Sequence, residues 1–115
     1  MATEEIVYCT SVIAGADLSA KQFYYTKLNA SGQIVLAGAG ERGLGILQDK
    51  PGLGQVGSVC ALGKSMGIYG AEVTAGQSLT PNASGKLVPA IANDAVVAMA
   101  AESGSAGEIR SVYLR

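Results

Sequence analysis

An internal repeat limits the folds that this chain can adopt. The segment Asn29-Ala30-Ser31-Gly32 returns as Asn82-Ala83-Ser84-Gly85, and each copy continues into an apolar run. In the same register, residues 54–59 (Gly-Gln-Val-Gly-Ser-Val) return as residues 107–112 (Gly-Glu-Ile-Arg-Ser-Val). Upstream, Val12–Leu18 matches Val73–Leu79, so the first copy carries extra residues before its Asn-Ala-Ser-Gly. Two copies are too few for a solenoid, which needs at least about three units to bury a core. We therefore expect one domain over residues 1–115, built from two related halves at about residues 12–59 and 73–112.

Glycine and proline interrupt the chain at short intervals. The sequence holds 16 glycines and 3 prolines, a pattern that disfavours long helices. The apolar or alternating segments between them are predicted strands: Ile6–Val12, Gln22–Leu28, Gln33–Ala37, Gly43–Gln48, Val56–Leu62, Ser65–Tyr69, Gln77–Thr80, Lys86–Val88, Val96–Ala101 and Glu108–Leu114. Many short strands at a spacing of roughly ten residues predict an all-β fold, a compact β-sandwich or partly open barrel with little or no helix.

The two Asn-Ala-Ser-Gly segments are predicted hairpin turns. Asparagine opens such a turn by accepting hydrogen bonds from the backbone ahead of it, and glycine supplies the positive φ that returns the chain. The segment Ile91–Glu102 contains good helix formers, but its repeat partner Gly38–Asp49 is rich in glycine and a poor helix. Equivalent positions in a duplicated fold share backbone geometry, so we predict a loop followed by a strand at both places.

The composition indicates a protein that hides part of its surface. Only 15% of the residues are charged and the mean hydropathy is +0.31, whereas about a quarter of residues are usually charged. We therefore expect contacts with other subunits. The net charge is −1 with scattered basic residues, which argues against nucleic acid as a partner. Apolar runs fall short of the roughly twenty residues of a membrane helix. Residues 1–5 lack the features of a secretory signal, so we expect synthesis in the cytoplasm.

The two cysteines lie inside predicted strands. We expect Cys9 and Cys60 to be small buried hydrophobic residues with free thiols. A disulfide would require their Cα atoms to approach within about 7 Å, and none is expected in a reducing compartment.

The sequence offers no catalytic constellation. It has no histidine, which removes the commonest general base and metal ligand. Residues 38–43 and 52–57 each fit the glycine pattern of dinucleotide-binding loops, but the glycines and the proline that follow Gly43 prevent the helix that this site requires. We expect no enzymatic activity, no cofactor and no metal. A pair of carboxylates meeting across strands stays open as a route to catalysis.

Tyrosine is the main aromatic residue, with five tyrosines against one phenylalanine and no tryptophan. Tyr24 and Tyr25 are neighbours on a predicted strand, so one faces the core and the other faces outward. We expect one of the two to anchor a subunit contact, because tyrosine suits interfaces. The residues Ala2, Thr3, Glu4 and Glu5 could form an extended arm that adds to the sheet edge of a neighbour. These six residues are the candidate partner-binding residues.

The sequence also resembles a known family, the head decoration or capsid cement proteins of tailed bacteriophages. The similar segments are residues 14–18, 29–32, 43–48, 54–59, 74–79, 83–90, 97–102 and 106–109. The resemblance implies a compact β-structure. It also implies that this structure forms a homotrimer, which sits on the outer surface of the expanded capsid at local three-fold positions. It implies the major capsid protein as partner, a location in the virion, and stabilisation of the capsid by clamping neighbouring capsid subunits.

Two other functions remain open on the sequence. One is a small β-sandwich glycan-binding module that presents Tyr24 or Tyr69 as an exposed platform, although the absence of tryptophan weakens it. The other is a β-module of a phage tail or baseplate.

Overall fold

The computed structural model describes residues 5–114, with side chains from Tyr8 onward. Within this range all regular elements are strands, which confirms the predicted all-β class. They are β1 (Glu5–Ile13), β2 (Tyr25–Leu28), β3 (Ile34–Leu36), β4 (Gly45–Leu47), β5 (Val56–Ile68), β6 (Ser78–Pro81), β7 (Leu87–Pro89), β8 (Ala98–Ala100) and β9 (Ile109–Leu114). The predicted strands Val56–Leu62 and Ser65–Tyr69 are one strand, because the chain continues through Gly63, which pairs with Leu114, without a turn.

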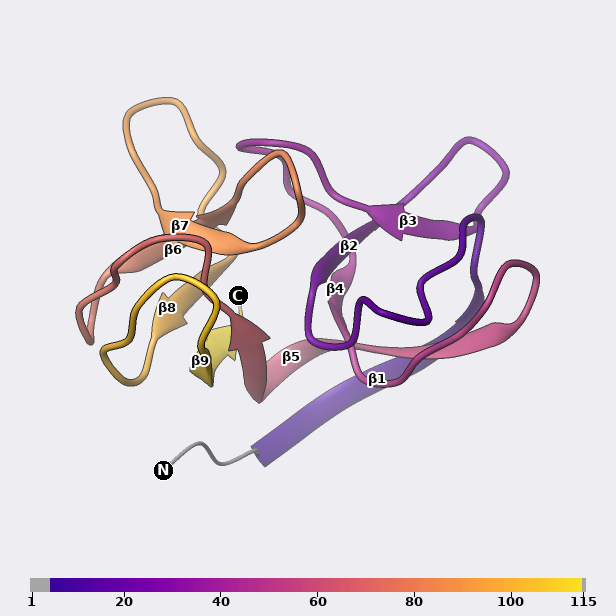
Figure 1. Ribbon diagram of the computed structural model, residues 1–115, viewed down its shortest axis with the longest axis horizontal. Helices are drawn as coiled ribbons and strands as arrows, with labels where there is room; N and C mark the ends of the chain where they lie inside the picture. Colours follow the sequence, from indigo (N-terminus) through magenta and orange to yellow (C-terminus); the bar gives the residue numbers. More distant parts are fainter. Residues whose placement is uncertain (1–4, 115) are drawn as a thin grey trace.

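The strands form a single antiparallel sheet that curls into an open half-barrel. Its order is β3-β2-β4-β5-β9-β8-β6-β7, and β1 pairs with β5 outside this path. Cys60 pairs with Cys9 of β1 and also with Ile46 of β4, so these two strands lie on opposite edges of β5. Figure 1 shows the short strands β2–β4 on one side of the molecule and β6–β8 on the other, with the long β5 between them.

The two halves of the sheet repeat the same pairing scheme and share β5. In the first half Ile13 pairs with Val56, where β1 meets the start of β5. In the second half Ile68 pairs with Ile109, where the end of β5 meets β9. The hairpins β2–β3 and β6–β7 then occupy corresponding places. The start of β5 is thus the last strand of the first half, and the end of β5 is the first strand of the second half.

Upstream of the first hairpin, the backbone hydrogen bonds show a different correspondence between residues of the two halves from the one that the sequence repeat suggests. Leu18 donates its backbone N–H to Pro51, and Val73 donates to Gly104 at the corresponding place. Leu18 therefore corresponds to Val73 and not to Leu79. The extra residues of the first half lie between Leu18 and Tyr24.

The turns recur with the same side-chain bonds to the backbone. Asn29 Oδ1 accepts hydrogen bonds from the N–H groups of residues 31 and 33, and Asn82 Oδ1 accepts from those of residues 84 and 86. Gly32 and Gly85 have φ values of 74° and 78°. The predicted turns are therefore confirmed, with asparagine and glycine in their expected roles.

The ambiguous segment before β8 contains no helix. Asp94 Oδ2 accepts a hydrogen bond from Ile91 N–H at 3.0 Å, and Glu41 Oε1 accepts one from Gly38 N–H at 2.6 Å in the corresponding loop. Each loop is followed by a strand, β8 or β4. The prediction of a loop and a strand at both places is confirmed.

The core joins the two halves. A smaller cluster lies within the first half and comprises Ala14, Leu18, Ile34, Leu47 and Val59. The larger cluster lies mainly in the second half but includes Tyr25, Ile46 and Cys60 of the first. The backbone N–H of Tyr25 also donates to Gly85 at 2.8 Å. Side chains of the first half thus complete the core of the second.

Candidate functional site

The predicted partner-binding residues lie in different surroundings. Ala2, Thr3 and Glu4 fall outside the described residues. Glu5 is the first residue of β1, where its backbone pairs with that of Lys64. Tyr24 is partly buried just before β2, and the Lys21 ammonium lies 4.9 Å from the centroid of its ring.

Tyr25 faces inward. It is 3% exposed, and its hydroxyl oxygen accepts a hydrogen bond from Gly43 N–H at 2.9 Å. Burial raises the pKa of this phenol. Of the two neighbouring tyrosines, only Tyr24 therefore has a ring that reaches the surface.

Tyr69, the other candidate for a sugar platform, is fully buried. Its hydroxyl donates a hydrogen bond to the carbonyl oxygen of Glu102 at 2.8 Å. Burial, reinforced by the nearby Glu102 charge, raises the pKa of Tyr69 to about 12. The suggestion that Tyr69 forms an exposed platform is wrong, because the start of the second half needs a large side chain to fill its core.

The structure instead exposes apolar side chains on the long strands. Tyr8 of β1 pairs with Leu62 of β5, and their exposed fractions are 54% and 47%. Two residues further along β5, Lys64 pairs with Tyr113 of β9. The Lys64 ammonium lies 5.6 Å from the centroid of the Tyr113 ring, which places both side chains on one face of the sheet. We call Tyr8, Leu62, Lys64 and Tyr113 the outer apolar face.

A second exposed apolar group lies at the other end of β1. Ile13 and Val56 are paired and both exposed, and Leu53 in the preceding turn is 70% exposed. Together with the outer apolar face, this group gives β1 exposed hydrophobic side chains near its start and at its end, and β5 exposed ones at its start and in its middle. Clustered exposed side chains of this kind are typical of surfaces that contact another protein.

The sequence alone did not identify these exposed apolar residues as a surface. Alternation places one side of a strand outward, but it does not say which strand lies beside it. The pairing of Tyr8 with Leu62 and of Lys64 with Tyr113 depends on contacts between distant segments. The number of tyrosines was the only signal that pointed to them.

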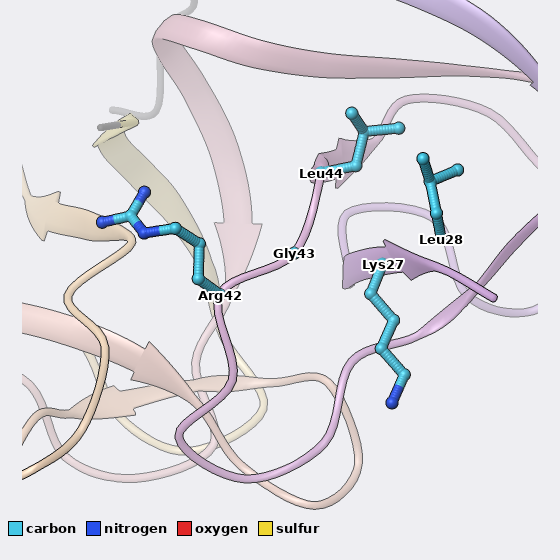
Figure 2. Close-up of a pocket in the computed structure, with 5 residues that line it drawn as sticks. All are labelled: Lys27, Leu28, Arg42, Gly43 and Leu44. Carbon is cyan, nitrogen blue, oxygen red and sulfur yellow. The ribbon is translucent and has the colours of Figure 1, made fainter. Parts of the chain in front are cut away.

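An open pocket of about 290 Å³ lies at the surface of the first half. It is lined by Lys27, Leu28, Arg42, Gly43 and Leu44, and Figure 2 shows the two cationic side chains extending in different directions. Lys27 donates a hydrogen bond to Glu41 at 2.9 Å, and Arg42 donates one to the carbonyl oxygen of Val96 at 2.5 Å. Both cations thus fasten neighbouring loops.

Charged groups of the second half gather where the loop before β9 meets the sheet. Glu102 accepts a hydrogen bond from Ser111 N–H, and Arg110 bridges Glu102 and Glu108. The bond from Ser111 lowers the pKa of Glu102, and a backbone bond from Ser105 lowers that of Glu108. Asp49 makes the corresponding bond to Ser58 in the first half. Because the bond between the carboxylate and the serine N–H recurs in both halves, it serves to fasten a loop.

Among residues 5–114, no group of three or more histidine, cysteine, aspartate or glutamate residues is placed to hold a metal ion. The same part of the chain contains no helix long and apolar enough to cross a membrane.

The two cysteines form a disulfide, which corrects the expectation of two buried free thiols. Cys9 and Cys60 are directly opposite each other on β1 and β5, with a Cα–Cα distance of 4.0 Å. Cys60 is fully buried, but Cys9 is exposed. The expectation failed because the register of two strands separated by 51 positions cannot be read from the sequence.

Comparison with known proteins gives an informative likeness in structure. No protein-family model and no curated protein matches the sequence. Among solved structures, the chain is similar to the N base of the head fiber protein gp8.5 of bacteriophage phi29, with a TM-score of 0.74. The likeness covers 94% of this chain and 93% of that chain, at 17% sequence identity. The two chains therefore share a fold over nearly the whole of both.

Proposed function

We propose that this chain is a non-enzymatic structural protein of a tailed-phage head. It binds the outer surface of the expanded capsid as a homotrimer and clamps neighbouring major capsid subunits. The observation that carries the proposal is the likeness, over nearly the full chain, to the base of a phage head fiber. The sequence resemblance to capsid decoration proteins points independently in the same direction.

The surface chemistry is compatible with this role. The outer apolar face supplies hydrophobic contact area, and the low charge of the chain limits repulsion between neighbouring copies. Three weak contacts from one trimer would act together, because the second and third form at an effective concentration of order millimolar. Binding can then depend on a spacing of capsid subunits that arises only on expansion.

The test is co-sedimentation of the purified chain with capsids of its phage that have been stripped of decoration, in unexpanded and expanded forms. We expect saturable binding to the expanded form alone. Tyr113→Asp, on the outer apolar face, should weaken binding about tenfold or more. Ile91→Asp, on an exposed loop outside that face, is the matched control and should bind as the parent does. If the folded parent binds neither form, the proposal fails and the glycan-binding and tail-module alternatives take its place.

A further inference from the structure

Strand β1 is attached to the sheet on one side only. Among the described strands it pairs with β5 alone, apart from a single bridge between Ala14 and Ile34 just beyond its end. Its counterpart in the second half is the end of β5, which pairs with β9 on one edge and with the start of β1 on the other. The same structural position is therefore an edge strand in the first half and an interior strand in the second.

The disulfide lies at this edge. Cys9 and Cys60 correspond to Lys64 and Tyr113 in the second half, where the contact is a cation over an aromatic ring. The covalent link thus occurs in the half whose outer strand has no second neighbour among the described strands. It adds to β1 an attachment that the interior position does not have.

The two cysteine residues differ in exposure. Cys9 is exposed on β1, whereas Cys60 is fully buried and belongs to the larger core cluster with Tyr25 and Ile46. Thiol–disulfide exchange requires in-line attack on a sulfur atom, so access decides which sulfur reacts first. An external reagent can reach Cys9 and is blocked from Cys60 by the packed core.

We propose that the Cys9–Cys60 disulfide is an oxidation-dependent lock on the edge strand β1 that closes and opens through Cys9. In closing, the Cys9 thiolate attacks a small disulfide such as glutathione disulfide and forms a mixed disulfide, with release of one glutathione thiolate. The Cys60 thiol then loses its proton and attacks Cys9 Sγ, which releases the second glutathione. Two protein thiols are oxidised and one glutathione disulfide is reduced to two thiols, so that electrons and protons balance.

In opening, a reducing thiolate attacks Cys9 Sγ and expels the Cys60 sulfur. This sulfur leaves as an anion among apolar side chains, where a charge is poorly solvated. The lock should therefore open slowly once it has formed. A chain made in a reducing compartment holds β1 by hydrogen bonds and by the packing of Val12, without a covalent link, and contact with an oxidising medium fixes the strand. This inference does not depend on the proposed function.

The first test uses the reduced wild-type chain. Brief native labelling with iodoacetamide, followed by denaturation and labelling with N-ethylmaleimide, reports the reactivity of each cysteine by mass spectrometry. We expect Cys9 to react about 100-fold faster than Cys60. Equal rates, or faster labelling of Cys60, would overturn the proposal.

The second test uses glutathione disulfide as the oxidant. Cys60→Ser should accumulate one glutathione adduct at Cys9, and Cys9→Ser should stay unmodified until denaturant is added. An adduct on native Cys9→Ser contradicts the order of steps. If either variant does not fold, the labelling rates of the two cysteines in the reduced wild-type chain test the proposal.

Hydrogen exchange tests the effect on the strand. Reduction of the wild-type chain should speed exchange of the β1 amides that donate to β5 by about tenfold and leave β9 unchanged. Equal protection of β1 in both redox states would show that the disulfide does not lock the strand.

Discussion

At the scale of single residues, the two halves place glycine and non-glycine side chains at the same demanding backbone positions. Phe23 and Asn93 have φ values of 71° and 74°, and the corresponding residues Gly76 and Gly40 have φ values of 90° and 69°. A positive φ costs a side chain with a Cβ about 1–2 kcal/mol, and asparagine tolerates it better than most residues. The backbone path of these turns is therefore set by the fold. At each position one half has glycine and the other half has a residue with a Cβ.

The two hairpin glycines test this reading of the turns. Gly32→Val and Gly85→Val should each lower the free energy of unfolding by at least about 1 kcal/mol, because a β-branched residue resists positive φ. The loss should be larger at Gly85, where an added Cβ would lie 3.0 Å from the carbonyl oxygen of Tyr25, whereas nothing lies within 4 Å at Gly32. Urea unfolding measures both. Ala30→Val, in an exposed position of the first turn, is the control and should change the free energy of unfolding little. Equal stability of all three variants and the parent would rule out the assigned turn geometry.

The lowered pKa of Glu102 predicts a dependence on pH. Hydrogen bonding to Ser111 and pairing with Arg110 favour the charged carboxylate, so its pKa lies below the ordinary value of 4.5. Its contribution to stability is complete above that value and is lost as the pH falls through the lowered pKa. Glu102→Gln should therefore be less stable than the parent at neutral pH, and the difference should shrink on acidification below 4.5. Urea midpoints across this range would show it, and a constant difference would contradict it.

At the scale of elements, β4 shows how the halves have diverged within one pairing scheme. Gly45 of β4 approaches β5 so closely that an added Cβ would lie 2.2 Å from the carbonyl oxygen of Cys60. The corresponding residue of β8 is Ala98, which pairs with Leu79 and Leu114. The contact between β4 and β5 thus needs glycine, and the contact between β8 and β9 accepts a methyl group.

This difference gives a paired prediction. Gly45→Ala should destabilise the fold by about 3 kcal/mol, because β4 and β5 must separate to admit the methyl group. Ala98→Gly should cost about 1 kcal/mol, the usual effect of added backbone freedom. Thermal and urea unfolding of both variants measure the contrast. Comparable losses at the two positions would show that the halves tolerate the same side chain here.

At the scale of the whole molecule, the shared strand and the shared core make the two halves interdependent. Tyr25, Ile46 and Cys60 of the first half belong to the larger core cluster, and β5 pairs with strands of both halves. A repeat joined by a linker would leave each half a core of its own. Here neither half contains all the side chains that bury its apolar surface.

We therefore expect the full chain to unfold in one cooperative transition. Backbone circular dichroism and tyrosine fluorescence should give coincident urea curves. A fragment of residues 63–115 lacks the first-half part of the core and should remain unfolded by the same measurements. Two separated transitions of the full chain, or a folded fragment, would show independent halves.

Much of the fold could be predicted from the sequence because its turns carry local signals. Asparagine and glycine specify the two hairpins, and the repeat resolved the ambiguous segment before β8. The strand β5 was divided in two because Gly63 resembles a turn residue, whereas the flanking strands hold it in the ladder.

The surface and the disulfide could not be predicted because they depend on register. Whether Cys9 meets Cys60, or Tyr8 meets Leu62, is fixed by the packing of β1 on β5, and a change of register would separate both pairs. Tyr25 shows the same limit, since alternation required one buried tyrosine but did not determine which.

The double role of β5 restricts where the chain can change in length. Each added residue in this strand would turn every following side chain to the opposite face, and the error would pass to β9 as well. At the tip of the first hairpin turn, a Cβ added at Gly32 would meet nothing within 4 Å. Natural insertions and grafted foreign peptides should therefore be tolerated in the first Asn-Ala-Ser-Gly turn and excluded from β5.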